Sequence, residues 1–266
     1  MCGHLRRLER RPELQVAPDY LAGQQEVLPG MRAMLVDWMG GVVVQLALLP
    51  ETLHLAVSCL DRFLQAEVAT LAKEQLQLVA AAALLLAAKY EESAPPELAE
   101  LAHTAGGGAP AAELRRMELR MLRRLEFRLG APAALRWARL ADPALLGAQA
   151  HQLAKYLLEL SLVDYRLVGV LPSRRAAAAA ALAARLLGTG SVRGVWQRRL
   201  EAVTGYTAEG LVEVVQQLAV LVGRAATNKS LLTVFRKFSG ERSLKVARLA
   251  VLASPLVATL AAGRHF

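Results

Sequence analysis

The chain has 266 residues, which is more than a typical single domain and indicates about two. Hydrophobic residues make up 55% of it and charged residues only 21%, so it can bury a sizeable core and is not typical of a disordered protein. The longest apolar runs, 78–88 and 176–184, are shorter than the roughly 18 residues that a membrane-spanning helix needs. We therefore expect no membrane span. Its two cysteines, Cys2 and Cys59, match neither a disulfide framework nor a metal site.

The net charge of +9 is unevenly distributed along the chain. Residues 1–130 hold 14 Lys and Arg against 16 Asp and Glu, whereas residues 131–266 hold 18 against 7. A basic second half suits an acidic, phosphate or nucleic-acid partner, although arginines scattered over a solvated surface give the same count. Aromatic residues make up only 5%, so platforms for stacking single-stranded bases are not expected. Direct binding of nucleic acid is the less favoured interpretation.

Helical periodicity covers most of the chain, with no alternating strand pattern of useful length and no Asn-Gly or Asp-Gly hairpin turn. In chain order, the first half predicts helices near 31–48, 50–65, 73–90, 96–104 and 111–126. The second half predicts helices near 143–163, 172–187, 193–203, 207–225 and 228–236. Proline and glycine mark the breaks between them. The sequence therefore predicts an all-α fold.

One helix in each half, 78–90 and 175–187, is unusually rich in alanine and apolar on every side. Such a helix must be buried on all sides, and alanine lets its neighbours approach closely. We therefore predict two tandem five-helix bundles, each around a central Ala-rich helix. The predicted divisions are an N-terminal segment 1–27, a first bundle 28–130, a second bundle 131–255 and a tail 256–266.

The stretch 31–38, MRAMLVDW, places four apolar residues at i, i+3, i+4 and i+7 of one helix face. By itself such a stripe is typical of core packing. Together with later motifs, however, it resembles the cyclin box of the A- and B-type cyclins. These motifs are ETLHLAV (51–57), LDRFL (60–64), LQLV (76–79), KYEE (89–92), RMEL (116–119), LEF (125–127), HQLAKYLLEL (151–160), DY (164–165) and TGY (204–206). The segments 232–239 and 246–248 resemble the third B-type subgroup.

The resemblance implies a regulatory subunit rather than an enzyme. Cyclins bind and activate a cyclin-dependent protein kinase and help recruit its substrates in mitotic or meiotic control, in the nucleus and the cytoplasm. The sequence has no phosphate-cradling glycine loop, nucleophile–base pair or metal cluster, so no cofactor or metal is expected. Two alternatives stay open: a degenerate cyclin-fold scaffold that does not activate a kinase and, less favoured, a DNA-binding transcription factor of related fold.

Within the cyclin resemblance, Lys89 and Glu118 match the two charged residues that hydrogen-bond the kinase backbone around its mobile C-helix. Charged groups suit this task because their bonds to backbone carbonyls and amides are strong and directional. The plainer interpretation is a solvated lysine at a helix C-terminus and a surface glutamate. Tyr90, Leu122 and Phe127 match apolar positions of the same surface, which would supply the buried centre of the interface.

A second surface resembles the groove in which cyclins receive short Arg-x-Leu docking motifs of substrates or inhibitors. Its matching residues are Met31, Met34, Leu35, Trp38, Leu76 and Gln77. The family usually has a glutamate at the second position of Gly40-Gly41. The carboxylate that would pair with the arginine of the docking motif is therefore missing here. We expect the groove to survive as an apolar slot with weakened selectivity for basic motifs.

A third candidate site is a phosphate pocket in the second half. His151 and Lys155 lie at i and i+4, hence on one helix face, and match two members of a phosphate-recognising pocket of B-type cyclins. Its third member is an upstream arginine, for which both Arg136 and Arg139 are candidates. A solvated basic face explains the same residues equally well.

Overall fold

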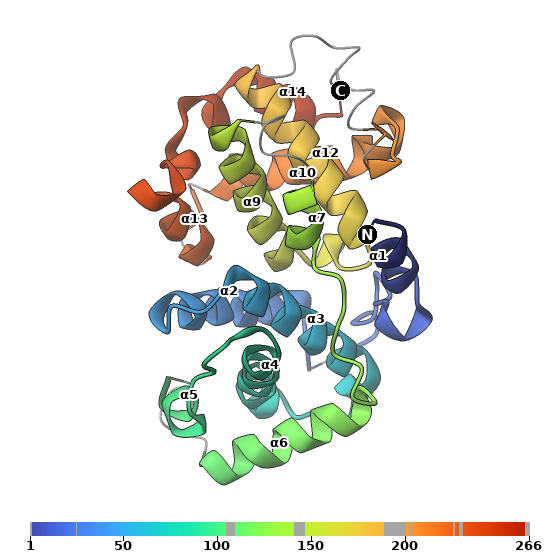
Figure 1. The fold of residues 1–266 in the computed structure, drawn as a ribbon, viewed down its shortest axis with the longest axis vertical. Helices are drawn as coiled ribbons and strands as arrows, with labels where there is room; N and C mark the ends of the chain where they lie inside the picture. The colour runs from blue at the N-terminus through green and yellow to red at the C-terminus, as the bar shows by residue number, and fades with distance from the viewer. Residues whose placement is uncertain are drawn as a thin grey trace. The chain divides into compact units, whose positions relative to one another are not determined.

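The structure, a computed structural model, describes residues 2–24, 26–104, 110–140, 147–188, 201–202, 204–225, 227–228 and 231–263. The chain divides into two compact units, Met1–Ala133 and Ala134–Phe266. Every regular element within these described ranges is helical, which confirms the predicted all-α fold of two tandem bundles (Figure 1). In the described part of the chain, no helix combines the length and the apolar character needed to cross a membrane.

The first unit is built around helix α4 (Leu76–Glu91). Its other α-helices are α1 (Cys2–Glu9), α2 (Pro29–Gln45), α3 (Pro50–Glu67), α5 (Leu98–Thr104) and α6 (Ala111–Arg124). Helices α2, α3, α5 and α6 all contact α4, which Figure 1 shows nearly end-on. Every residue from Val79 to Ala88 is buried. The first predicted central helix is thus confirmed, and its alanines let four helices pack around one axis.

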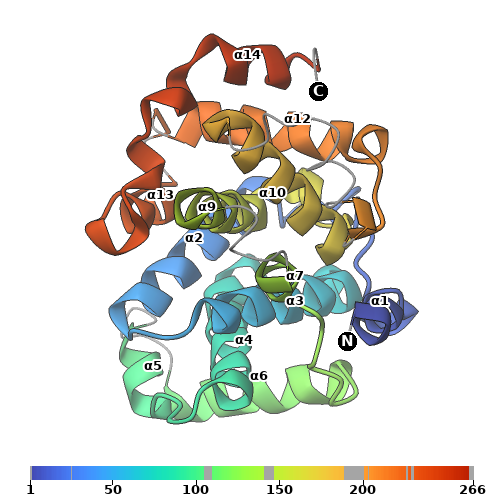
Figure 2. The same ribbon diagram turned by 45° about the horizontal axis from the view of Figure 1, so that its top comes forward.

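The second unit repeats this plan around α10 (Pro172–Leu187), in which every residue from Ala176 to Ala184 is buried. Helices α7 (Ala134–Leu140), α9 (Ala148–Val163) and α12 (Ala208–Ala225) contact α10 directly. Helix α13 (Thr233–Phe238) packs on α9, and α14 (Pro255–Ala261) runs along α12 (Figure 2). The second predicted central helix is therefore confirmed as well.

Two short helices of the second unit differ from the prediction. The sequence predicts no helix where α7 lies, and it predicts a tail at 256–266 where the structure has α14. Helix α14 begins at Pro255, a residue suited to the first helical position, and buries Val257 and Leu260. Each helix has only seven residues, too few for a helical period to stand out in the sequence. The predicted helix 193–203 lies almost entirely outside the described residues.

The N-terminal segment is attached to α3 by hydrogen bonds. Arg62 donates from Nε to the carbonyl oxygen of Glu13 at 3.2 Å, and the Tyr20 hydroxyl donates to Asp61 Oδ1 at 2.9 Å. Leu21 is buried next to this second bond. The segment predicted as 1–27 therefore packs as part of the first unit and covers one side of α3.

A buried ion pair joins α2 to α3. Arg32, whose exposed fraction is 1%, donates from Nε to Asp61 Oδ1 and from Nη2 to Oδ2, both at 2.7 Å. Burial by itself lowers the pKa of Arg32, but the adjacent Asp61 carboxylate raises it above the ordinary arginine value. The arginine thus stays charged inside the unit because a bidentate carboxylate compensates it. Arg32 lies in the MRAMLVDW stretch, but the sequence predicted no role for it.

Replacing Asp61 by alanine would leave the Arg32 guanidinium charged and buried without its partner. We expect the Asp61→Ala variant to lose about 3–5 kcal/mol of unfolding free energy, measured by urea denaturation followed by circular dichroism. The double variant Arg32→Met/Asp61→Leu removes both charges and should regain much of this loss. Arg115→Ala, at an exposed position of α6, should change the unfolding free energy by about 0.5 kcal/mol or less. A similarly small effect of Asp61→Ala would contradict the assignment.

Candidate functional site

The packing of α6 against α4 brings Lys89 and Glu118 together. Lys89 lies in the last turn of α4, just beyond its buried stretch, and Glu118 lies in the middle of α6. Lys89 Nζ is 2.5 Å from Glu118 Oε1. The side chain of the lysine is 50% exposed and that of the glutamate 10%. Lys89 and Glu118, predicted from the sequence as candidate site residues 29 positions apart, therefore form an ion pair at the surface of the first unit.

The Lys89–Glu118 ion pair can make further hydrogen bonds. A lysine ammonium carries three donors, and a carboxylate has about four acceptor positions, so one bond between the two groups leaves capacity on each. The half-exposed ammonium of Lys89 can donate to a backbone carbonyl of a partner, and the Glu118 carboxylate can accept from a backbone amide. The pair is suited to bind a backbone segment that offers both groups.

Exposed apolar side chains accompany the ion pair. Tyr90 is 56% exposed and Phe127 68% exposed, whereas Leu122 is half-buried. Phe127 adopts φ +58°, a left-handed conformation that is rare for a bulky residue. The end of α6 sets this conformation, since the Phe127 amide donates to the Leu122 carbonyl at 2.9 Å across the last turn. The exposed Phe127 ring is thus available for contact with a partner, and this role stays a prediction.

Tyr90 lies against a glycine of the segment that follows α6. A Cβ atom at Gly130 would lie 2.6 Å from the Tyr90 hydroxyl oxygen, closer than real Cβ contacts allow. The sequence placed Gly130 at the junction between the two bundles. The structure gives it a second role, because the missing side chain leaves room for the tip of Tyr90.

The last glutamate of the KYEE motif has a structural role. Glu92 follows α4, and its Oε1 accepts a hydrogen bond from the Leu49 amide at 2.7 Å. The same oxygen accepts a bond of 2.5 Å from the Thr52 hydroxyl. Glu92 thereby ties the end of α4, where Lys89 and Tyr90 lie, to the beginning of α3. Sequence reasoning missed this role because the contact joins residues 40 or more positions apart.

The predicted docking stripe lies on the less buried face of α2. Met34 is 57% exposed, while Val36 and Met39, which do not belong to the stripe, are buried. The other members of the stripe are half-buried: Met31, Leu35 and Trp38. On α4, Leu76 is buried and Gln77 is exposed. The stripe is thus a surface feature rather than core, and its use as a peptide groove stays a prediction.

Helix α2 runs without a break through Gly40 and Gly41 to Gln45. Each glycine inside a helix costs about 1 kcal/mol relative to alanine, so packing must hold this part of α2 together. Gly40 is buried and Gly41 is half-buried. Gly41, the position where the resemblance implies a glutamate, is therefore partly accessible to solvent.

The residues of the predicted phosphate pocket lie on two helices that pack together, α7 and α9. His151 and Lys155 are both half-buried and lie one turn apart on α9. Arg136 is exposed on α7. Arg139 belongs to α7 by its backbone, but its side chain lies outside the described residues. The pocket stays a prediction.

Metal binding and the buried thiol of Cys59 are the other features that bear on chemistry. In the described part of the chain, no group of three or more His, Cys, Asp or Glu side chains is placed to hold a metal ion. Cys59 is fully buried in α3, and this burial raises the pKa of its thiol to about 12. The Cys59 thiol therefore stays protonated at neutral pH and is a poor nucleophile.

Comparison with known families decides the identity of the fold. A model described as "Cyclin, N-terminal domain" matches residues 1–130, and one described as "Cyclin, C-terminal domain" matches residues 134–252. The chain belongs to the cyclin family. This confirms the resemblance that the motifs indicated, and the two matches fall on the two structural units.

Within the cyclins, the chain is similar to mitotic B-type proteins. It is 39% identical over 260 residues to a G2/mitotic-specific cyclin-B1 of Oryzias latipes, covering 97% of this chain and 62% of the relative. It is 38% identical over 256 residues to a G2/mitotic-specific cyclin-B2 of Rana japonica, covering 96% and 64%. The chain thus spans less than two thirds of the length of these relatives. Membership of the third B-type subgroup stays a prediction.

A solved structure shares the cyclin fold. The X-ray structure of a viral cyclin from herpesvirus saimiri matches with a TM-score of 0.65 at 20% identity, covering 82% of this chain and 96% of that chain. At this identity the likeness shows the fold alone.

The close approach of Gly130 and Tyr90 can be tested by a double-mutant cycle. Gly130→Ala should lower the unfolding free energy by at most about 1 kcal/mol, because the new methyl group meets the tyrosine hydroxyl, which is the end of an exposed side chain that can move aside. In a Tyr90→Phe background the same change should cost much less, since the hydroxyl is gone. Gly30→Ala, where a Cβ meets nothing within 4 Å, is the matched control and should not destabilise. Equal losses in both backgrounds would show that the contact does not matter.

Proposed function

We propose that this cyclin is the regulatory subunit of a cyclin-dependent serine/threonine kinase in mitotic or meiotic control, acting in the nucleus and the cytoplasm. The observation that carries the proposal is the Lys89–Glu118 pair, which lies at the surface of the first unit. Tyr90, which follows Lys89 in the chain, and Phe127 both expose their rings. The similarity to G2/mitotic-specific cyclins supports the same role. Catalysis belongs to the kinase, and this chain is not itself an enzyme.

Activation follows from differential binding. The Lys89–Glu118 pair hydrogen-bonds the kinase backbone around its mobile C-helix, and it does so only when that helix lies in its inward, active position. A partner that prefers one state shifts the equilibrium toward it by its difference in affinity. To convert a kinase population that is almost entirely inactive into one that is almost entirely active, the binding free energies for the two states must differ by about 5.5 kcal/mol. The apolar contacts of Tyr90, Leu122 and Phe127 supply much of this energy.

The ion pair also prepares the surface before the kinase arrives. A free lysine side chain loses up to about 2 kcal/mol of rotamer entropy when it is immobilised. In this chain the bond to the largely buried Glu118 restricts Lys89 in advance. Preorganisation of this kind raises affinity by lowering the entropy lost on binding.

Substitutions of Lys89 and Glu118 test whether the pair contacts the kinase or only stabilises the cyclin fold. Lys89→Ala and Glu118→Ala should each weaken association with a mitotic kinase by about tenfold or more, because each removes a charge-assisted hydrogen bond. Phosphorylation of a histone-type substrate should fall in parallel. The measurements are co-purification with the kinase and the phosphorylation rate, with circular dichroism to confirm folding.

The exchanged variant Lys89→Glu/Glu118→Lys is the decisive control. It keeps an ion pair inside the cyclin but reverses the donors and acceptors that the kinase would meet. We expect stability near that of the wild type and no recovery of kinase binding. Full recovery would show that the pair is only structural. Association without kinase activity in the unmodified chain would favour the degenerate scaffold, for which the Gly40-Gly41 pair is the specific observation.

The docking groove should accept Arg-x-Leu peptides with little preference for the arginine. Gly41→Glu supplies the missing carboxylate and should raise the preference for Arg-x-Leu over Ala-x-Leu peptides by about tenfold, as expected of a charge-assisted bond. Gly41→Gln is the neutral control, because it raises helix propensity in the same way without adding charge. Isothermal titration calorimetry with both peptides measures the difference. Equal preferences in the two variants would place the groove elsewhere.

A further inference from the structure

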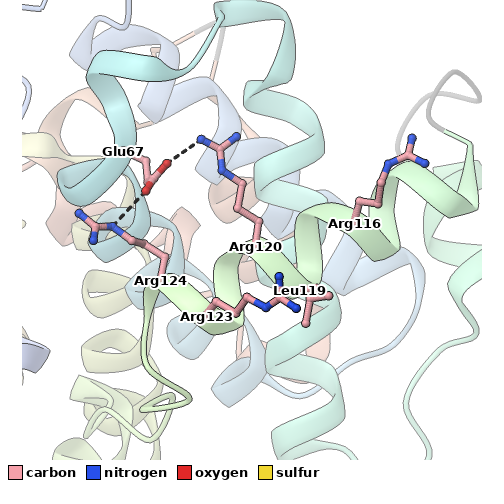
Figure 3. Close-up of a pocket in the computed structure, with 6 residues that line it drawn as sticks. All are labelled: Glu67, Arg116, Leu119, Arg120, Arg123 and Arg124. Carbon is pink, nitrogen blue, oxygen red and sulfur yellow. Dashed lines mark hydrogen bonds and ion pairs between the residues drawn. The ribbon is translucent and has the colours of Figure 1, made fainter.

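A basic depression lies on the outer face of α6, apart from the residues proposed to contact the kinase. Its volume is about 490 Å³. The residues that line it are Glu67, Arg116, Leu119, Arg120, Arg123 and Arg124 (Figure 3). All except Glu67, the last residue of α3, come from one face of α6 at a spacing of three or four residues. Four guanidinium groups thus share the depression with a single carboxylate.

Two of the four arginines are already held in place. Arg120 Nη2 lies 2.6 Å from Glu67 Oε2, and Arg124 Nε lies 3.1 Å from Glu67 Oε1. The Arg120 guanidinium also lies 5.8 Å from the centre of the Phe63 ring, and Arg124 donates to the carbonyl oxygen of Ala66 at 3.0 Å. These bonds orient both guanidinium groups at the edge of the depression nearest α3.

The other two arginines are available to a ligand. The Arg116 side chain is 72% exposed, and its one ion pair with a residue that the structure describes is a long one, 3.8 Å to Glu113 of the same helix. Arg123 is exposed and has no ion-pair partner among the residues that the structure describes. Leu119 lies between these two along α6 and is 43% exposed (Figure 3). An apolar side chain is therefore flanked by two exposed cations, of which Arg116 has a weak ion pair and Arg123 has none in the described part of the chain.

We propose that this depression binds an acidic peptide segment of a partner protein. Carboxylates of the peptide pair with Arg116 and Arg123, whose planar guanidinium groups suit bidentate bonds. An apolar side chain of the peptide covers Leu119 and removes its exposed surface from water. The excess of positive charge attracts such a segment before contact is made.

The lining residues favour a peptide over a nucleic acid. The residues that line the depression include no aromatic side chain on which a base could stack. Exposed Leu119, in contrast, gives an apolar contact that a peptide side chain can use.

The depression is a separate surface from the proposed kinase contact. Glu118 and Leu122 lie on a neighbouring face of α6, because successive helix residues are rotated by about 100°. A bound acidic segment would therefore lie beside the kinase. Binding of the peptide is nevertheless a property of the cyclin alone and does not rest on the proposed kinase function.

Fluorescence anisotropy of a labelled peptide, in which a leucine is flanked on both sides by glutamates, tests the proposal with the full chain. We expect measurable binding at low salt that weakens as salt is raised. Arg116→Glu and Arg123→Glu should each reduce the affinity by about tenfold or more, since each replaces an attraction by a repulsion. Arg115→Glu, on the same helix but outside the depression, makes the same charge change and should leave the affinity within about twofold.

Two peptide controls and one DNA control complete the experiment. Glutamine in place of every glutamate should abolish binding, and alanine in place of the leucine should weaken it. Equal loss of affinity in Arg115→Glu and Arg123→Glu would overturn the proposal by showing that net charge alone attracts the peptide. A single-stranded DNA bound more tightly, and lost in the same two variants, would overturn it in favour of nucleic acid. Lys89→Ala should bind the peptide like the wild type, so the two proposals fail independently.

Discussion

Burial of α4 on every side is the constraint on which the rest of the first unit depends. From Val79 to Ala88 the helix exposes no side chain to water, so α2, α3, α5 and α6 must all pack around it. Alanine makes this geometry accessible because its small side chain lets backbones approach closely. The burial ends abruptly at Lys89, which is exposed although its neighbour Ala88 is buried. The position of α6 against α4 then decides that Glu118 meets this lysine.

In each unit an ion pair joins two helices of the bundle. In the first, Arg32 and Asp61 join α2 to α3. In the second, Lys237 of α13 donates to both carboxylate oxygens of Glu159 of α9, at 2.6 and 2.8 Å, and Glu159 is 2% exposed. A buried pair adds little net stability, but losing one partner leaves an uncompensated charge inside. Apolar packing alone allows several positions of a peripheral helix on the core. The ion pair favours the position in which its two charged groups meet.

Helix α6 serves three purposes on three faces. Leu114, Met117 and Met121 are buried against the core, and Glu118 and Leu122 lie at the proposed kinase surface. The remaining face carries the arginines of the depression. A helix with about 100° between successive residues can separate an apolar, a mixed and a basic face in this way. The first half of the chain is close to neutral in total, so its positive charge is concentrated by this helix rather than by composition.

Local patterns in the sequence determined most of the described helices, the two Ala-rich centres and the family. Helical periodicity and apolar composition act within one element, and so the sequence displays them directly. The roles of single side chains were different. Arg32 and Asp61 are 29 positions apart, Glu92 reaches residues 40 or more positions away, and Gly130 matters only because Tyr90 lies against it. Only the tertiary structure decided these roles, because they depend on which distant residues the packing of helices brings within hydrogen-bonding distance.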